Sequence, residues 1–427
     1  MSTANTASIG SLTSAYTPPT ATRLEPVAPP ERIQGLDLLR GWAMFGVLWS
    51  NLNDWYGTAD PTTSFDRGLA FAQEWLVESR FYTLLCFLFG VGFGIQLMRA
   101  AERGKSVQRT YIRRSAALLA IGLVHALIVW HGDILTMYAL VSFSLLLFRD
   151  TSPKRLLLWA IGFYLFAWDV IFRIRWLAGQ RFMVPRGGFA TSSWIFAHGS
   201  LAQIGHERLL AVADWYGRWA LTTYFSILAM FLAGVWGLRS GYVTRVIKDP
   251  RATRRLLGWS IAVALVGYAS FFFGAKLWPI RPGAVEPTDW RAALLNPRHL
   301  IFHAIDLSTE ATALAYAALL LLAFQTKRGA RLLAPLAATG RMALTTYLTQ
   351  SVVSTFLFYS WGLGWFGRVG YTGMFAITLT LFGLQMAAST WWLKRYQFGP
   401  VEWVWRTLTY GRAPTMRATS VAPTLSL

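Results

Sequence analysis

Apolar stretches of about 20 residues recur along the chain, and this is the length that a helix needs to cross the apolar part of a bilayer. We expect about ten such helices, which begin near Leu36, Phe81, Ala116, Ile134, Leu156, Trp219, Leu257, Leu300, Leu332 and Gly373. A helix satisfies its own backbone hydrogen bonds, whereas an open strand or loop that faces lipid does not. The sequence therefore predicts an all-α fold, a polytopic integral membrane helical bundle.

The composition of the chain agrees with a membrane protein and excludes several soluble classes. Hydrophobic residues make up 54% of the 427 residues and charged residues only 14%, which is unlike an ordinary soluble domain. The one cysteine, Cys86, lies in an apolar stretch, so an internal disulfide and a cysteine-based zinc site are both excluded. We expect the lipid bilayer to be a partner of the chain.

The basic residues predict the orientation of the bundle. Clusters of Lys and Arg follow the second, fourth, sixth, eighth and tenth expected helices, at 99–114, 149–155, 239–255, 327–331 and 394–395. With ten helices these clusters share one side, which the positive-inside rule makes cytoplasmic, as are both termini. The chain is expected as a multi-pass protein of the bacterial cytoplasmic (inner) membrane. Because the loops account for the net charge of +20, no nucleic-acid partner is expected.

Two short tails flank the apolar part of the chain. Residues 1–31 are rich in Ser, Thr, Ala and Pro, and they have neither the basic start nor the apolar core of a signal peptide. We expect a disordered cytoplasmic tail at 1–31, a transmembrane helical domain at 32–412 and a second disordered tail at 413–427. The oligomeric state is left open, and a homo-oligomer is compatible with the sequence.

A polar break separates the third and fourth expected helices in the segment GLVHALIVWHGDILTMYAL. His125 lies within the third helix, and Asp133 starts the fourth after a turn at Gly132, where glycine tolerates turn dihedrals. A carboxylate that orients an imidazole makes a general base, so His125 and Asp133 are candidate catalytic residues. Asp133 is equally suited to cap the fourth helix. His131 is interpreted as an interfacial bystander.

Polar side chains in the first two expected helices are candidate substrate contacts, because such groups are costly within a membrane. Asp37 and Arg40 share one helix face, so Arg40 either pairs with Asp37 or binds an anionic group from the cytoplasm. Asn51 either links helices or contacts substrate. Arg80 either extends to the outer surface or contacts substrate there. The glycines of GVGFG at 90–94 indicate close helix packing rather than a nucleotide loop.

A polar stripe marks the eighth expected helix. The residues His299, His303, Asp306 and Glu310 follow spacings of 4, 3 and 4, which places them on one face turned toward the bundle interior. This stripe suits a substrate wall or a proton path, and no metal is expected because the spacing matches no known zinc signature. Arg341 is expected near mid-membrane, where it either contacts Glu310 or binds a phosphate or carboxylate of a ligand.

Five segments of the chain resemble one family of bacterial membrane proteins. They are RIQGLDLLRGWAMFGVLWSNL at 32–52, SRFYTLLCFLFGVGFG at 79–94, GDILTMYAL at 132–140, GRMALTTYLTQS at 340–351 and FGPVEWVWRTLTYG at 398–411. The most specific parts are GDIL-x-x-YA at 132–139 and GP-x-EW-x-WR at 399–406. These motifs resemble the YeiB-like proteins, which end in domain of unknown function 418, expected here at about 230–412.

The YeiB-like proteins are in turn distantly similar to transmembrane acyltransferases, including the acyltransferase-three proteins and the lysosomal enzyme that acetylates heparan glucosamine. The opening LD-x-x-RG at 36–41 is similar to theirs. The resemblance implies transfer of an acyl group from cytoplasmic acyl-CoA, as co-substrate, to a small-molecule, glycan or lipid acceptor at or beyond the membrane. It also implies that His125 is the base. A transporter and a non-catalytic membrane component are the alternatives.

Overall fold

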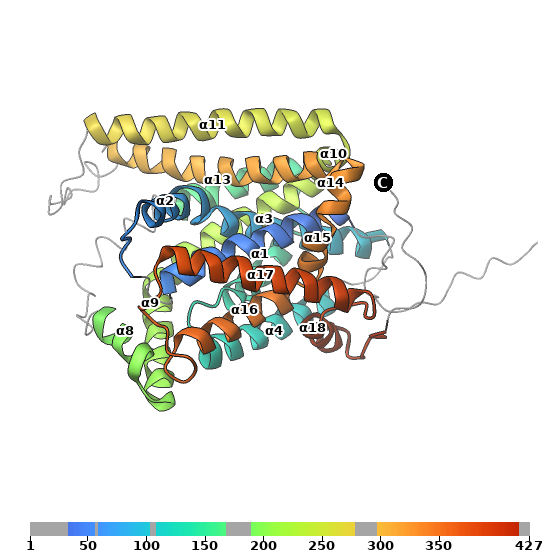
Figure 1. Ribbon diagram of the computed structural model, residues 1–427. Helices are drawn as coiled ribbons and strands as arrows, with labels where there is room; N and C mark the ends of the chain where they lie inside the picture. The colour runs from blue at the N-terminus through green and yellow to red at the C-terminus, as the bar shows by residue number, and fades with distance from the viewer. Residues whose placement is uncertain (1–32, 56–58, 103–107, 168–188, 278–296, 418–427) are drawn as a thin grey trace, which may run out of the picture.

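The computed structural model describes residues 33–55, 59–102, 108–167, 189–277 and 297–417 (Figure 1). Within these ranges all of the extended regular elements are helices, and Tyr396 pairs with Arg417 in an isolated bridge. The expected tail at 1–31, residues 418–427 of the second tail and the side chain of His299 lie outside the described residues.

The first half of the chain forms helices of unequal length. They are α1 (Gln34–Trp55), α2 (Ser64–Ala72), the π-helix η2 (Gln73–Val77), α3 (Arg80–Glu102), α4 (Gln108–Val124), the π-helix η3 (His125–Val129), α5 (Leu135–Ser144), the 3₁₀ turn η4 (Leu145–Phe148), α6 (Pro153–Leu165) and α8 (Phe189–His198). The second half continues with α9 (Leu201–Arg239), α10 (Tyr242–Lys248), α11 (Pro250–Leu277), α13 (Pro297–Phe324), α14 (Lys327–Leu332), α15 (Ala334–Arg341), α16 (Ala343–Phe358), α17 (Tyr371–Leu393) and α18 (Pro400–Tyr410).

Six helical segments are long and apolar enough to cross a membrane: Ser64–Gln96, Gln108–Val129, Trp219–Arg239, Pro250–Gly274, His303–Phe324 and Tyr371–Leu393. With helices as its repeated element, the chain is an all-α, multi-pass membrane protein. Other expected helices take a different form, because α5 with η4 is a short apolar segment and the ninth expected helix is broken into α15 and α16. The count of about ten helices and the cytoplasmic termini stay predictions.

The helices pack around a centre formed by α1, α3 and α9. Figure 1 shows α11 and α13 side by side at one edge of the bundle, and these two helices pack extensively on each other. On the inner side α13 contacts α3 and α1, α9 contacts α3 and α6, and α1 contacts α15 and α17. The buried core follows these contacts, with fully buried Leu38, Leu88 and Phe231 on the three central helices.

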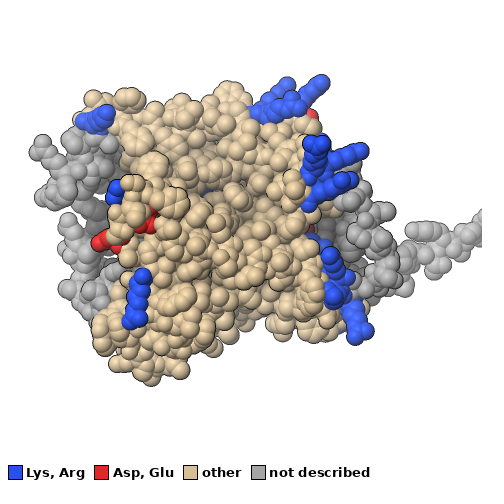
Figure 2. All heavy atoms as spheres, in the orientation of Figure 1, with Lys and Arg blue, Asp and Glu red and all other residues tan. Residues whose placement is uncertain are grey.

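Basic side chains gather at one end of the bundle in the view of Figure 2, the end at which α10 and α14 lie in Figure 1. Acidic side chains and a few basic ones are visible at the opposite end. The broad apolar surface between the two ends is what a bilayer would cover. This distribution agrees with the charge pattern of the loops. We name the two ends the basic end and, after its predicted orientation, the outer end.

Close helix crossings in the bundle depend on glycine, and two of them bear on the site. A side chain at Gly90 of α3 would overlap the carbonyl oxygen of Phe231 in α9, so the prediction that GVGFG serves helix packing is confirmed. A side chain at Gly340 of α15 would overlap the carbonyl oxygen of Asp37 in α1. The second crossing holds α15 against α1 at the point where the ninth expected helix breaks.

The segment after α18 folds back onto the bundle instead of leaving it. The Gln397 amide donates to the Met416 carbonyl at 2.9 Å, and the Trp403 indole donates to the Pro414 carbonyl at 2.8 Å. Residues 413–417, which the sequence placed in a disordered tail, are therefore tied to α18 and to the segment before it through backbone carbonyls that composition does not reveal.

Candidate functional site

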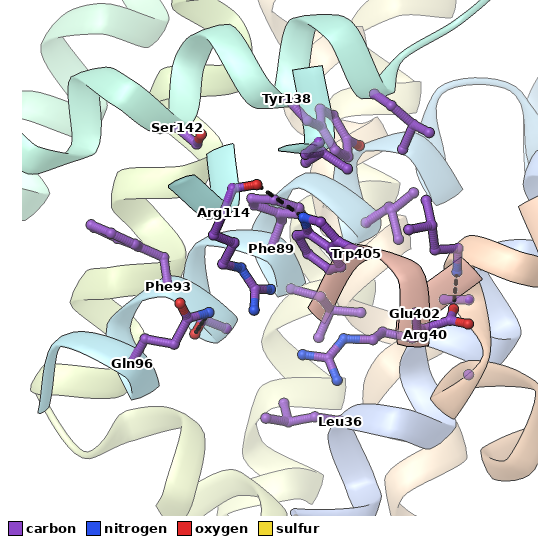
Figure 3. Close-up of a pocket in the computed structure, with 18 of the residues that line it drawn as sticks. Leu36, Arg40, Phe89, Phe93, Gln96, Arg114, Tyr138, Ser142, Glu402 and Trp405 are labelled. Atoms are coloured by element: carbon purple, nitrogen blue, oxygen red, sulfur yellow. Dashed lines mark hydrogen bonds between the residues drawn. The ribbon is translucent and has the colours of Figure 1, made fainter. Parts of the chain in front are cut away.

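A cavity of about 290 Å³ lies between α1, α3, α4, α5, α16 and α18 (Figure 3). Its lining runs along α1 from Ile33 to Met44, a depth of about 16 Å for a helix. The shallow part contains Gln96, Arg114 and Tyr410 at the basic end, and the deep part is closed by residues of α5 and α16. We call it the arginine cavity, after the four arginines in its lining: Arg40, Arg114, Arg341 and Arg406.

The arginine cavity has an excess of positive charge. Only two carboxylates, Asp37 and Glu402, share the lining with the four arginines. Arg40 donates to Asp37 at 2.8 Å, so the ion pair expected within the first helix is confirmed. Figure 3 shows the guanidinium groups of Arg40 and Arg114 directed into the same space. Guanidinium groups at a partly dehydrated surface bind phosphate or carboxylate groups in a defined geometry.

Helix α18 builds one wall of the arginine cavity. The Arg114 guanidinium stacks 3.9 Å from the ring centre of Trp405, whose indole donates to the Arg114 carbonyl at 2.9 Å. Arg406 lies 4.5 Å from the ring centre of Phe398. These cation–π contacts hold both arginines over aromatic rings and limit their rotamers. The EW-x-WR part of the family motif thus supplies one of the four arginines, Arg406, and the Trp405 ring that orients another, Arg114.

Glu402 secures the break between α15 and α16. Its carboxylate accepts hydrogen bonds from the amides of Leu344 and Thr345, at 2.7 and 3.0 Å, and from the Thr345 hydroxyl at 2.5 Å. These amides lie in the first turn of α16 and have no partner within the helix. Burial raises the pKa of the Glu402 carboxyl, while the hydrogen bonds from Thr345 oppose that rise.

His125 and Asp133 form a buried pair near the inner end of the arginine cavity. The His125 Nδ1 lies 2.8 Å from Asp133 Oδ1. The other oxygen of Asp133 accepts from the amide and the hydroxyl of Thr136, both at 2.7 Å. The expected cap is confirmed, since one oxygen of Asp133 accepts from the first turn of α5. The other oxygen contacts the imidazole, and a catalytic role for the pair stays a prediction.

A π-helical turn sets the position of His125. The chain leaves α-helical geometry at His125–Val129, and π-turns of this kind often occur at functional sites. Buried Arg208 of α9 donates to the carbonyls of Leu127 and Ile128 within this turn. The expected turn at Gly132 is confirmed, since His131 and Gly132 form a turn between η3 and α5. Its backbone is not left-handed, so glycine is needed there for another reason: the Trp130 ring covers it and leaves no room for a side chain.

The second ring nitrogen of His125 is buried and lacks a hydrogen-bond partner within the described part of the chain. When Nδ1 donates its proton to Asp133, Nε2 carries the lone pair that a general base needs. The imidazole ring lies 5.2 Å from the ring centre of Tyr347 and 6.3 Å from that of Trp130. Tyr347 lines the arginine cavity whereas His125 does not, so the tyrosine ring stands beside both.

A second, much smaller cavity of about 10 Å³ lies further toward the outer end of α1 and α16. We call it the outer cavity, and its lining residues are Leu48, Asn51, Leu52, Trp130, Tyr347, Gln350, Ser351 and Ser354. Asn51, predicted as a substrate contact, is thus placed in the outer cavity. Arg40 and Arg341, predicted to bind an anionic group, are placed in the arginine cavity.

Arg80 is buried instead of extending to the surface. It donates to the carbonyls of Glu74 and Glu78, at 3.1 and 2.5 Å, and to the Tyr268 hydroxyl at 3.0 Å. These contacts tie the start of α3 to η2 and α11. Arg80 lines neither of the two cavities, and its predicted contact with substrate is not tested by them.

The polar stripe of α13 is also separate from both cavities. The side chains of His303, Asp306 and Glu310 lie on a helix that packs against α11 and α3, and none of them lines either cavity. The expected contact between Arg341 and Glu310 is wrong, because Arg341 donates to the Gln397 carbonyl at 3.4 Å in the arginine cavity. The break at Met342 turns Arg341 toward α18, which a continuous helix would not do.

Sequence reasoning missed several residues that the structure brings to the site. Arg114 was counted among the basic loop residues, and Tyr347 carries no charge that would draw notice in an apolar helix. Glu402 and Arg406 were seen only as part of the GP-x-EW-x-WR motif. The signal available for these two was a carboxylate and an arginine at fixed spacing beside two tryptophans, at the start of a short helix after Gly399.

Comparison with known proteins places the chain among proteins of undetermined function. Residues 237–412 match the family described as "Protein of unknown function (DUF418)". The chain is 32% identical to the uncharacterized protein YxaH of Bacillus subtilis, over 91% of this chain and 96% of the relative. It is 28% identical to the uncharacterized protein YeiB of Escherichia coli, over 91% of this chain and 100% of the relative. The chain therefore belongs to the YeiB-like family.

Proposed function

We propose that this protein is a membrane acyltransferase that takes an acyl group from cytoplasmic acyl-CoA and passes it to a hydroxyl or amine of an acceptor. The observation that carries the proposal is the arginine cavity, which reaches from the basic end of the bundle to the tyrosine beside the buried His125–Asp133 pair. Arginines in the lining, and a base behind the tyrosine at the deep end, would match the two ends of an acyl-CoA molecule.

The lining of the arginine cavity suits the two chemistries of acyl-CoA. Its four arginines would hold the phosphates, and the apolar side chains of Met44, Leu88, Phe89 and Leu118 would surround the thioester arm. A volume of about 290 Å³ is too small for the whole molecule. The nucleotide would therefore stay at the mouth among the arginines, with the thioester directed toward Tyr347.

The His125–Asp133 pair would supply general base catalysis. His125 Nε2 removes the proton of the acceptor while the acceptor oxygen or nitrogen attacks the thioester carbonyl. The carbon–sulfur bond then breaks, and the CoA thiolate takes the proton from the imidazolium. Asp133, held by Thr136, stabilises the imidazolium through Nδ1.

A transporter is the second candidate function. The observation that favours it is the presence of cavities on both sides of Tyr347, which would suit a solute that crosses the bundle in steps. In proteoliposomes a transporter would carry a solute without consuming acyl-CoA. An acyltransferase would release CoA thiol in proportion to the acyl group transferred.

Inverted membrane vesicles, which expose the cytoplasmic face, provide the test. We expect radiolabelled acetyl-CoA to bind, and label to appear in a vesicle product. His125→Ala should lower the transfer rate by about 10²–10⁴-fold and leave binding within a few-fold of the wild-type value. His206→Ala, at an exposed histidine of α9, is the matched control. Absence of binding, or full transfer by His125→Ala, would overturn the proposal.

A further inference from the structure

We propose that Tyr347 is a closed gate between the two cavities, and that the outer cavity receives an uncharged hydroxyl group from the outer side. The identification of that hydroxyl with the acyl acceptor rests on the acyltransferase function proposed above. The gate itself does not, because it follows from the cavities alone.

Tyr347 is the one residue within the described ranges that lines both cavities. It lies midway along a face of α16 on which Leu344 borders the arginine cavity and Gln350, Ser351 and Ser354 border the outer cavity. Intervals of three or four residues keep these side chains on one face of the helix. This face therefore passes from one cavity to the other, and the Tyr347 ring blocks the passage.

One long hydrogen bond holds the Tyr347 phenol among the described residues. The phenol oxygen accepts a long hydrogen bond from the Ile134 amide, at 3.4 Å, and a bond of that length is weak. The ring is buried, and its centre lies 5.2 Å from the centre of the His125 ring. A rotation of the side chain that moves the ring away from His125 would join the two cavities beside the imidazole.

The lining of the outer cavity suits a neutral hydroxyl group. Amide and hydroxyl side chains of Asn51, Gln350, Ser351 and Ser354 line it, and no charged side chain does. The Ser354 hydroxyl is buried and has no hydrogen-bond partner within the described part of the chain. A volume of about 10 Å³ holds a group no larger than one water. Only the reacting hydroxyl of a larger molecule, such as a sugar or polyol, would enter.

Separation of the two cavities by the Tyr347 ring would protect the thioester from water. With the ring in place, water at the outer face cannot reach a thioester in the arginine cavity, and the two substrates approach the base from opposite sides. Opening the ring only when both cavities are occupied would limit hydrolysis of the thioester. Neutral donors on one side of the ring and guanidinium groups on the other keep each substrate in its own cavity.

Thiol accessibility tests the gate without any acyl-CoA. Cys86 is the only cysteine in the chain, so Cys86→Ala gives a cysteine-free parent. Asn51→Cys then reports on the outer cavity and Gln96→Cys on the arginine cavity. A membrane-impermeant thiol reagent is applied to right-side-out and to inverted vesicles. We expect each cysteine to react from one side only, and addition of Tyr347→Ala to raise the rate from the opposite side at least ten-fold.

Two further variants separate gating from misfolding. Tyr347→Phe keeps the ring and should preserve one-sided labelling. Tyr359→Ala removes another buried tyrosine of the outer half, which lines neither cavity, and should also preserve it. Two-sided labelling of the parent, or one-sided labelling that persists in a monodisperse Tyr347→Ala protein, overturns the gate. A failure to bind acetyl-CoA leaves this result unaffected and overturns only the acyltransferase function.

Protection from labelling tests the outer cavity. Glycerol supplied to right-side-out vesicles should slow the reaction of the Asn51→Cys variant several-fold, because its hydroxyls match the neutral lining. Sodium phosphate, tested against sodium chloride at equal ionic strength, should have no effect. Equal protection by phosphate, or none by glycerol, shows that the outer cavity does not select neutral hydroxyl groups.

Discussion

At the scale of single residues, the carboxylate of Asp133 performs two tasks with two oxygens. One oxygen contacts the His125 imidazole and the other accepts two hydrogen bonds from Thr136. A cap alone would leave the first oxygen to solvent, and a catalytic pair alone would leave the start of α5 uncapped. The two tasks are separable by substitution because an amide can replace only one of them.

We expect Asp133→Asn to keep the fold and lose acyl transfer. The amide oxygen can still accept from Thr136, but a neutral group cannot stabilise an imidazolium, so the transfer rate should fall by about 10²–10⁴-fold. Asp133→Ala should in addition destabilise the protein by about 1 kcal/mol through the lost cap. Thermal unfolding in detergent and transfer from labelled acetyl-CoA measure the two effects, with exposed Asp150→Asn as control. Equal transfer rates of Asp133→Asn and the wild type would contradict a role for the Asp133 charge in acyl transfer.

Also at this scale, His131 makes stability depend on pH. Burial and the nearby Arg208 lower the pKa of His131 to about 4, from an ordinary value of 6.5. Between these values the unfolded state binds more protons, so the contribution of His131 to stability is present above pH 6.5 and is lost as the pH falls toward 4. His131→Phe keeps the stacking on Phe196 and should show a smaller decrease in melting temperature from pH 7 to pH 5. An identical decrease in melting temperature in the wild type and His131→Phe would show that His131 does not cause the pH dependence.

At the scale of helices, the break between α15 and α16 organises the site. It turns Arg341 into the arginine cavity. It also leaves two backbone amides free of helical partners, and the Glu402 carboxylate of α18 accepts hydrogen bonds from both. Apolar periodicity predicts a helix over this segment and is correct about helix formation. It cannot reveal the break, because the break depends on a carboxylate about 60 residues away in the chain and on the approach of α1.

Glu402→Ala should destabilise the protein by about 1–3 kcal/mol, because it leaves buried donors of Leu344 and Thr345 without an acceptor. Glu402→Gln retains an acceptor oxygen and should destabilise it less. Denaturation of the purified protein in detergent measures both. Equal stability of the alanine variant and the wild type would show that the carboxylate does not secure α16.

The crossing of α1 and α15 can be tested by replacing a glycine at the crossing and, as a control, a glycine on another helix. Gly340→Ala places a methyl group against the Asp37 carbonyl and should lower the melting temperature. Gly383→Ala in α17 meets no atom within 4 Å and should stabilise by up to about 1 kcal/mol through helix propensity. The two substitutions should change the melting temperature in opposite directions. A rise with both would indicate that α1 and α15 can move apart at their crossing without loss of stability.

At the scale of the whole molecule, the charge pattern predicts that the basic end of the bundle faces the cytoplasm. Alkaline phosphatase folds only outside the cytoplasm, so a fusion after Asp150 should be inactive and one after Gly199 active. A fluorescent protein after Leu427 should fluoresce, because it matures in the cytoplasm. The reverse pattern would place the arginine cavity on the outer side, where no acyl-CoA is present.

The sequence alone determined the fold class, the family and the separation of charge between the two ends of the bundle. These properties depend on local composition and on short motifs. The length of the apolar stretches and the charge of the loops between them can be read directly from the sequence. The tertiary structure alone decided which polar residues meet. It placed Arg40 and Arg341 with Arg114 and Arg406, removed Glu310 from Arg341, and set Tyr347 between two cavities. Such contacts depend on where helices cross and break, and neither is encoded in the periodicity of a single helix.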